Sequence, residues 1–246
     1  MLHMPNPLYT LLDWVLPRLC CLCGLKTDIN RDLCTVCYRL LPWTDYRCYR
    51  CGAHVEKPNE HIQCEKCTER PPHFDRLCTL FDYRPPVTKL ITGLKYANQF
   101  VHGKLLGELL IEGVNEWYAK TPLPEAIIPV PLHLKRFRQR GFNQVFELLK
   151  PLDKKHNQHK QNKHPLPILW DAVIRTRHAR PQSSLSALSR KHNLKEIFSV
   201  PNPLPFQHVA IMDDVVTTGS TASKLAEALK ATGSIDRVDV WCIARA

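Results

Sequence analysis

The chain has 246 residues, of which 44% are hydrophobic and 23% are charged, and its formal net charge at pH 7 is +11. This composition is ordinary for a soluble globular protein and argues against a disordered or membrane-embedded chain, and the length allows one large domain or two smaller ones. The positive charge favours an anionic partner: a nucleic acid, a phosphorylated small molecule or an acidic protein.

The N-terminal stretch contains an apolar run at residues 8–16 that Asp13 interrupts, and no basic cluster precedes it. The run is too short to span a bilayer and lacks the layout of a signal peptide. We therefore expect an amphipathic helical cap on the rest of the fold, in a cytoplasmic protein with no membrane insertion.

A cysteine-rich region follows, in which nine of the eleven cysteines lie between residues 20 and 67. Eight of them form C-x-x-C pairs, which typically present two thiolates to one metal ion. Zinc, disulfides and an iron centre are the alternatives, and zinc is favoured because the spacing repeats and a cytosolic thiol stays reduced. The four pairs are Cys20/Cys23, Cys34/Cys37, Cys48/Cys51 and Cys64/Cys67.

Four C-x-x-C pairs predict two zinc sites, and their ligands can be paired in two ways. Sequential pairing joins the first pair with the second and the third with the fourth, whereas a cross-braced arrangement joins alternate pairs. We favour sequential pairing because it closes the shortest loops. Eight thiolates contribute eight negative charges and two Zn²⁺ four positive ones, so the metallated chain carries about +7.

The cysteine-rich region is predicted to be a scaffold that the metals hold folded, because so short a segment contains little core of its own. Direct nucleic-acid contact is the alternative, since Tyr46, Arg47, Tyr49 and Arg50 around the third pair would suit stacking and phosphate contact. Outside the pattern, Cys78 and Cys242 lie in apolar runs and are expected to be small core residues.

Beyond the Pro71-Pro72 junction, apolar runs alternate with stretches of helical spacing. Alternation of strands and helices predicts an α/β fold with a mainly parallel sheet flanked by helices, and divides the chain into residues 1–75 and 76–246. Strands are predicted at residues 76–83, 126–130, 172–174, 209–212 and 238–244, and helices at residues 87–96, 102–118, 143–149 and 220–231.

The stretch VAIMDDVVTTGSTAS at residues 209–223 carries the clearest functional signal. Its first four residues predict a buried strand, with Asp213 and Asp214 emerging at the carboxyl end, where ligands gather in such folds. Gly219 would let the backbone approach a ligand, and Ser220 or Thr221 would cap the following helix.

The turn after this strand has the features of a phosphate site. Main-chain N–H groups and a helix N-terminus would hold one phosphate, with the hydroxyls of Thr217, Thr218, Ser220 and Thr221 around it. The carboxylates of Asp213 and Asp214 would accept hydrogen bonds from vicinal ribose hydroxyls. The combination predicts a ribose 5-phosphate pocket. The alternative is a strand-turn-helix unit with solvated acids and no ligand site.

DDVVTTGST resembles the phosphoribosyl-pyrophosphate (PRPP) signature of type I phosphoribosyltransferases, and nearly the whole chain resembles the ComF/GntX family. That family joins a double zinc ribbon to a phosphoribosyltransferase-like domain. Besides the DDVVTTGST and C-x-x-C motifs, the resemblance includes LKY at residues 94–96, PVPLH at 129–133, RGFNQ at 140–144, RTR at 175–177, Gln182, Arg190 and Asn193.

The resemblance implies roles for several basic residues. Lys95, at a turn after a helix, and Arg140 would be catalytic, contacting pyrophosphate presented with Mg²⁺. Arg136 and Arg138, with Arg140 on a basic loop that resembles a flap over the active site, would bind pyrophosphate or nucleic acid, as would Arg175 and Arg177. A solvated basic face is the alternative interpretation. Residues 154–167 depart from the family pattern and are expected to form a mobile, polar surface loop.

Three functions remain open at this stage. The resemblance implies natural competence, with single-stranded DNA, a helicase-like protein and a recombination mediator as partners, and Phe137 and Phe142 beside the arginines would suit stacking on bases. A working phosphoribosyltransferase would displace pyrophosphate from ribose C1 with an acceptor that the sequence does not identify. An adaptor for other proteins is the third alternative.

Overall fold

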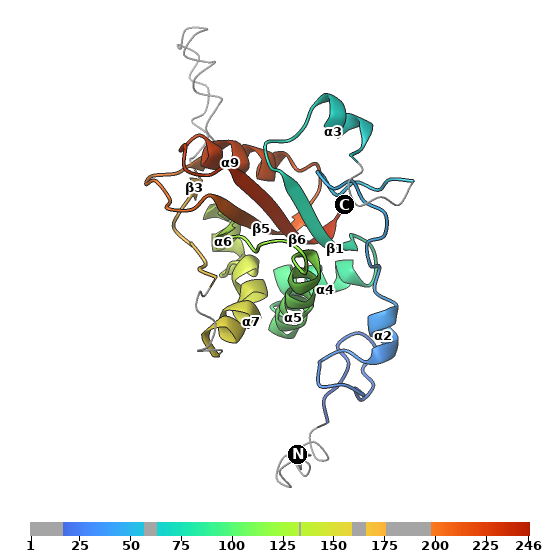
Figure 1. Cartoon of the computed structure of the whole chain (residues 1–246). Helices are drawn as coiled ribbons and strands as arrows, with labels where there is room; N and C mark the ends of the chain where they lie inside the picture. The colour runs from blue at the N-terminus through green and yellow to red at the C-terminus, as the bar shows by residue number, and fades with distance from the viewer. Residues whose placement is uncertain (1–16, 57–62, 133, 159–165, 176–197) are drawn as a thin grey trace, which may run out of the picture.

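A computed structural model describes residues 17–56, 63–132, 134–158, 166–175 and 198–246 of the chain (Figure 1). The cap predicted within residues 1–16 lies outside these ranges. None of the helices in the described parts of the chain combines the length and the apolar character needed to cross a bilayer.

Four parallel strands form the main sheet, in the order β1-β6-β5-β2. This arrangement confirms the predicted α/β fold with a mainly parallel sheet. The strands run over β1 (Arg76–Asp82), β2 (Ala126–Pro129), β5 (His208–Val216) and β6 (Arg237–Arg245).

Helices cover both faces of the sheet, with α4, α5 and α7 on one face and α9 on the other (Figure 1). β5 shows why its apolar run is continuous: Ala210 and Met212 pack toward α4 and α5, whereas Val209 and Ile211 pack toward α9. The helices are α2 (Thr35–Arg39), α3 (Glu65–Glu69), α4 (Val87–Ala97), α5 (Phe100–Trp117), α6 (Leu134–Arg140), α7 (Gln144–Gln158) and α9 (Ser220–Lys230).

Two predicted segments differ from the structure. The strand expected at residues 172–174 is the short β3 (Ile174–Arg175), which pairs antiparallel with β4 (Phe198–Ser199) outside the main sheet. The loop expected at residues 154–167 begins inside α7 and ends beside β2, where the Ile127 N–H donates to the Pro167 carbonyl (2.8 Å). Residues 159–165 of that loop lie outside the described ranges.

Candidate metal centres and ligand site

The eight cysteines of the C-x-x-C pairs form two separate clusters, and within each cluster the four Sγ atoms lie within 4.8 Å of one another. The Sγ atoms of Cys23 and Cys34 are 3.8 Å apart, and those of Cys51 and Cys64 are 3.7 Å apart. Tetrahedral zinc with Zn–S bonds of about 2.3 Å places sulfur atoms about 3.8 Å apart, so both clusters fit Zn²⁺. Sequential pairing is confirmed and the cross-braced alternative is wrong: the clusters are Cys20, Cys23, Cys34 and Cys37, and Cys48, Cys51, Cys64 and Cys67.

Each cluster begins with a tight turn that a glycine closes. The Gly24 N–H donates to the Cys20 carbonyl, and the Gly52 N–H donates to the Cys48 carbonyl, both at 2.8 Å. Gly24 has a φ of 76° and Gly52 a φ of 68°, in the left-handed region that favours glycine. We call residues 17–41 the first zinc module and residues 46–69 the second.

Each module continues with a cysteine at the N-cap of a short helix: Cys34 precedes α2, and Cys64 precedes α3. Although burial opposes ionisation, main-chain N–H groups, that of Cys34 foremost, lower the pKa of the Cys20 thiol to about 6. Burial is likewise outweighed by main-chain N–H groups at Cys48, whose pKa is lowered. At these two cysteines the backbone thus favours the thiolate form that binds zinc, whereas burial raises the pKa of Cys37 and Cys67.

Three of the four aromatic and basic residues around the third C-x-x-C pair are engaged in contacts within the protein, whereas Tyr46 is exposed. Arg47 forms an ion pair with Asp82 of β1, and Arg50 donates to the Pro72 carbonyl (3.1 Å). The guanidinium carbon of Arg76 lies 5.3 Å from the centroid of the Tyr49 ring. These contacts favour the scaffold interpretation of this region over direct nucleic-acid contact.

The DDVVTTGST motif spans the end of β5 and the start of α9. β5 pairs with β6 as far as Val216, so Asp213 and Asp214 lie within the strand. The sequence had indicated that they follow it. The turn between strand and helix is therefore confined to residues 217–219.

The turn enters α9 through Gly219, which is the N-cap residue and has a φ of 74°. The prediction that Ser220 or Thr221 caps the helix is wrong; instead, Thr218 Oγ1 accepts a hydrogen bond from the Ser220 N–H (3.3 Å). The first N–H groups of α9 and the positive end of its dipole favour an anion. The side chains of Thr217, Thr218 and Ser220 are exposed beside them.

The two acids lie in different environments, because successive strand residues point to opposite faces of a sheet. Asp214 is buried and forms an ion pair with Lys95. Burial raises the pKa of Asp213 well above its ordinary value, and the charge of Asp214 acts in the same direction. The carboxyl oxygens of both residues can accept hydrogen bonds from ligand hydroxyls.

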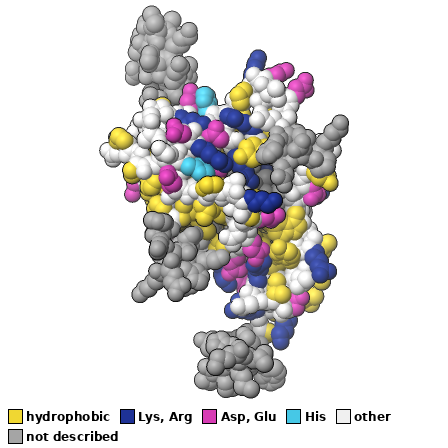
Figure 2. Space-filling view, viewed as in Figure 1, with side chains coloured by type: hydrophobic (Ala, Val, Ile, Leu, Met, Phe, Trp, Pro, Cys, Tyr) yellow, Lys and Arg dark blue, Asp and Glu magenta, His cyan; other side chains and the backbone are white. Residues whose placement is uncertain are grey.

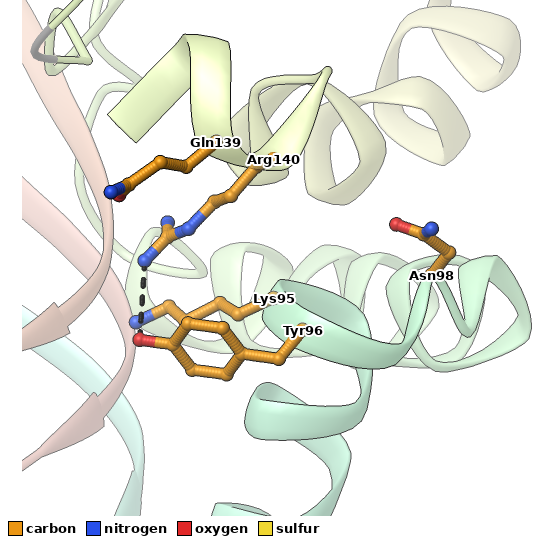
Figure 3. Close-up of a pocket in the computed structure, with 5 residues that line it drawn as sticks. All are labelled: Lys95, Tyr96, Asn98, Gln139 and Arg140. Atoms are coloured by element: carbon orange, nitrogen blue, oxygen red, sulfur yellow. Dashed lines mark hydrogen bonds between the residues drawn. The ribbon is translucent and has the colours of Figure 1, made fainter. Parts of the chain in front are cut away.

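Lys95 connects this strand end to a pocket of about 480 Å³. Lys95 lies in the last turn of α4, and not in a turn after the helix as expected. Figure 3 shows Lys95 and Tyr96 from α4 and Arg140 from α6 converging on one space beside Gln139. Asn98 also lines this pocket.

Arg140 holds α6 against the end of α4. Its Nη2 donates to the Tyr96 hydroxyl (3.4 Å), its guanidinium carbon lies 5.2 Å from the Tyr96 ring centroid, and its Nη1 donates to Gln144 (2.9 Å). Two cations with several neutral polar groups suit a polar anionic ligand. Sequence reasoning missed Tyr96, Asn98 and Gln139 as lining residues; the LKY motif was a signal for Tyr96, whereas only the docking of α6 brings Gln139 to the pocket.

The basic segment expected as a loop is helical, since LKRFRQR contains no glycine or proline and α6 ends where Gly141 takes a φ of 76°. Arg138 is exposed on this helix. Arg175 lies on β3, with its guanidinium 5.7 Å from the Phe198 ring centroid. The side chains of Arg136 and Arg177, and Gln182, Arg190 and Asn193, lie outside the described part of the structure.

Comparison with known proteins places these features in a family. The double zinc ribbon domain matches residues 11–68. DNA utilization protein YhgH of Escherichia coli (strain K12) is 37% identical over 234 residues, which cover 93% of this chain and 97% of that protein. Competence protein F of Haemophilus influenzae is 34% identical over 222 residues, which cover 88% of this chain and 92% of that protein. Because these similarities extend over both the zinc modules and the α/β sheet, the chain belongs to the ComF family.

Proposed function

We propose that this protein acts in competence or DNA utilisation, the roles named for its relatives, through a site that binds the ribose phosphate of PRPP. The observation that supports this most directly is the turn at Gly219, which presents the N-terminus of α9 beside the Lys95–Asp214 ion pair. A phosphate at the helix N-terminus and a cation beside two acids match the two ends of a phosphorylated ribose.

The ligand would lie across three parts of the site. The 5-phosphate contacts residues 217–221, the ribose hydroxyls contact Asp213 and Asp214, and the pyrophosphate extends with Mg²⁺ toward Lys95 and Arg140. Lys95 already pairs with Asp214, so the pyrophosphate competes with that carboxylate for the ammonium group. Guanidinium and ammonium groups would then stabilise pyrophosphate as a leaving group if an acceptor attacks ribose C1.

Calorimetry with PRPP, in the presence and absence of Mg²⁺, tests this proposal. Asp213→Asn and Asp214→Asn should each weaken binding at least about tenfold, because each replaces a carboxyl oxygen with an NH₂ group that cannot accept a hydrogen bond from a ribose hydroxyl. Asp236→Asn, an exposed site between α9 and β6, is the matched control and should bind like the wild type. Absence of any heat at millimolar PRPP with the wild type would remove the ribose-phosphate site and the transferase together.

Single-stranded DNA is a second candidate ligand, favoured by exposed Phe137 and Arg138 on α6 near the Arg140–Tyr96 pair. Rings and cations together suit stacked bases and phosphates. However, on the face seen in Figure 2 the Lys and Arg side chains are interspersed with Asp and Glu and do not form one continuous basic surface. Binding of single-stranded DNA, like binding of the helicase-like and recombination-mediator partners, is therefore to be tested separately from PRPP binding.

Competition with an unlabelled single-stranded oligonucleotide, repeated at several salt concentrations, measures the affinity for DNA. The logarithm of the affinity should fall with the logarithm of the salt concentration, with a slope of about −0.7 per phosphate contacted. Arg138→Gln should reduce that slope, whereas a flat salt response would contradict DNA binding through these cations.

A further inference from the structure

Residues 70–75 connect the second zinc module to β1 and cross directly over the phosphate-binding turn. The His73 N–H donates to the hydroxyl of Ser223 in α9 (3.1 Å). Phe74 is only 1% exposed, and a Cβ built at Gly219 would lie 3.6 Å from its Cζ. The Phe74 ring therefore packs against the one residue of the turn that has the most backbone freedom.

The connector is fixed at both of its ends. Next to Phe74, Asp75 bonds to Val238 of β6 twice, by donating its N–H and by accepting through its carboxylate, both at 2.8 Å. The carboxylate of Asp75 also pairs with Lys230 at the end of α9 (2.7 Å). At the other end, Arg50 of the second zinc module donates to the Pro72 carbonyl (3.1 Å).

The first zinc module contacts a different part of the molecule. Arg31 forms an ion pair with Glu112, and Asp32 pairs with Lys104 (2.6 Å), both partners lying on α5. In Figure 1, α2 lies on the side of α4 and α5, whereas α3 lies on the side of α9. The two zinc modules thus lie on opposite sides of the same sheet.

We propose that the second zinc module positions the phosphate-binding turn through His73 and Phe74, so that its metal sets the order of residues 217–221. Glycine pays the largest backbone entropy on being fixed, and Gly219 must hold a left-handed conformation for α9 to begin at Ser220. A packed ring and a hydrogen bond to the first turn of α9 supply that restraint from outside the turn. The effect on ligand affinity rests on the proposed ribose-phosphate site, whereas the effect on order does not.

The sharpest test compares one cysteine in each cluster. Cys37 and Cys67 occupy equivalent positions, each the third residue of its short helix. Cys67→Ser and Cys37→Ser should each release one zinc ion, measured by metal analysis of the full-length protein. Amide hydrogen exchange in residues 217–223 should become about tenfold faster in Cys67→Ser and stay near the wild-type rate in Cys37→Ser.

A second pair of variants keeps both metal clusters intact and covers the case in which Cys67→Ser fails to fold. Ser223→Ala removes the hydroxyl that accepts the His73 N–H, and exchange in the turn should quicken about fivefold, which corresponds to one net hydrogen bond. Ser234→Ala is the matched control, because its hydroxyl bonds to Thr232 beyond the C-terminal end of α9 (3.1 Å). Exchange in β6 should be unchanged in both variants.

Binding of ribose 5-phosphate to the same variants then reports on function. If the wild type binds it, Ser223→Ala should weaken binding and Ser234→Ala should not. If the wild type does not bind it while the turn still loosens in Cys67→Ser or Ser223→Ala, the proposed function fails and the positioning role stands. Equal exchange in the turn of all four variants and the wild type, or equal loosening by Cys37→Ser, overturns the positioning role.

Discussion

The two zinc modules share one local design but are attached to the rest of the protein in different ways. Both use a turn closed by a left-handed glycine, followed by a cysteine at a helix N-cap. The first contributes Leu33 and Leu41 to the core on the α5 face. The second is attached by polar contacts between its backbone and the sheet: the Arg245 Nε of β6 donates to the Cys51 carbonyl (3.1 Å). Similar metal sites thus serve two purposes: one closes a hydrophobic core, and the other braces the edge next to the ligand site.

Removing both metals should give the largest effect, since structural zinc contributes about 10–16 kcal/mol to folding in zinc-finger peptides. Chelation should make the described residues between 17 and 69 exchange their amides freely, and re-adding Zn²⁺ should restore protection. Because the first module covers core residues, its loss should also expose apolar surface next to α5, detectable with a fluorescent hydrophobic dye. Protection that persists in both modules after complete metal removal would contradict the assignment of the clusters as structural.

Alanine substitutions at the two turn glycines should give the next largest difference between the modules, in the free energy of unfolding. Both substitutions place a side chain in the left-handed region, which costs about 1–2 kcal/mol. At Gly24 a Cβ would meet no atom within 4 Å, whereas at Gly52 it would lie 2.5 Å from Cδ2 of buried Leu77. Gly52→Ala should therefore lower the free energy of unfolding by about 1–3 kcal/mol more than Gly24→Ala.

Thermal or urea unfolding of the two metal-loaded variants measures this difference. A larger loss in Gly24→Ala would mean that the second module is not packed against β1 as described.

The smallest predicted difference concerns two arginines whose side chains are equally exposed, at 17%. Arg31 pairs with Glu112, which is 45% exposed, whereas Arg47 pairs with Asp82, which is 31% exposed, and also donates to the Gly52 carbonyl (3.0 Å). Arg31→Met should cost no more than about 1 kcal/mol and Arg47→Met about 2 kcal/mol, because the latter leaves a less solvated carboxylate and an unpaired carbonyl.

The salt dependence of unfolding sharpens that comparison. The cost of Arg31→Met should shrink at high salt, where exposed ion pairs are screened, and the cost of Arg47→Met should change less. Equal costs with equal salt dependence would contradict the expected difference between these two ion pairs.

Within the ligand site, sequence reasoning succeeded where the signal was local. The apolar run before Asp213 predicted a buried strand, and Gly219 predicted a close turn, because backbone conformation at a glycine is a local property. The turn was placed too early because the end of β5 depends on pairing with β6, which no local pattern reports. Arg140 was proposed from its motif, but its contact with Tyr96 required α6 to fold onto α4.

The sequence by itself determined the metal ligands, the α/β class and the presence of a glycine turn before α9, because thiol spacing, hydrophobic periodicity and glycine placement act over a few residues. Tertiary structure alone decided that Lys95 reaches Asp214, that Arg140 closes on Tyr96, and that Phe74 packs against Gly219. These contacts join residues far apart in the chain, and their partners are selected by how helices pack on the two faces of a twisted sheet, which is a property of the whole core.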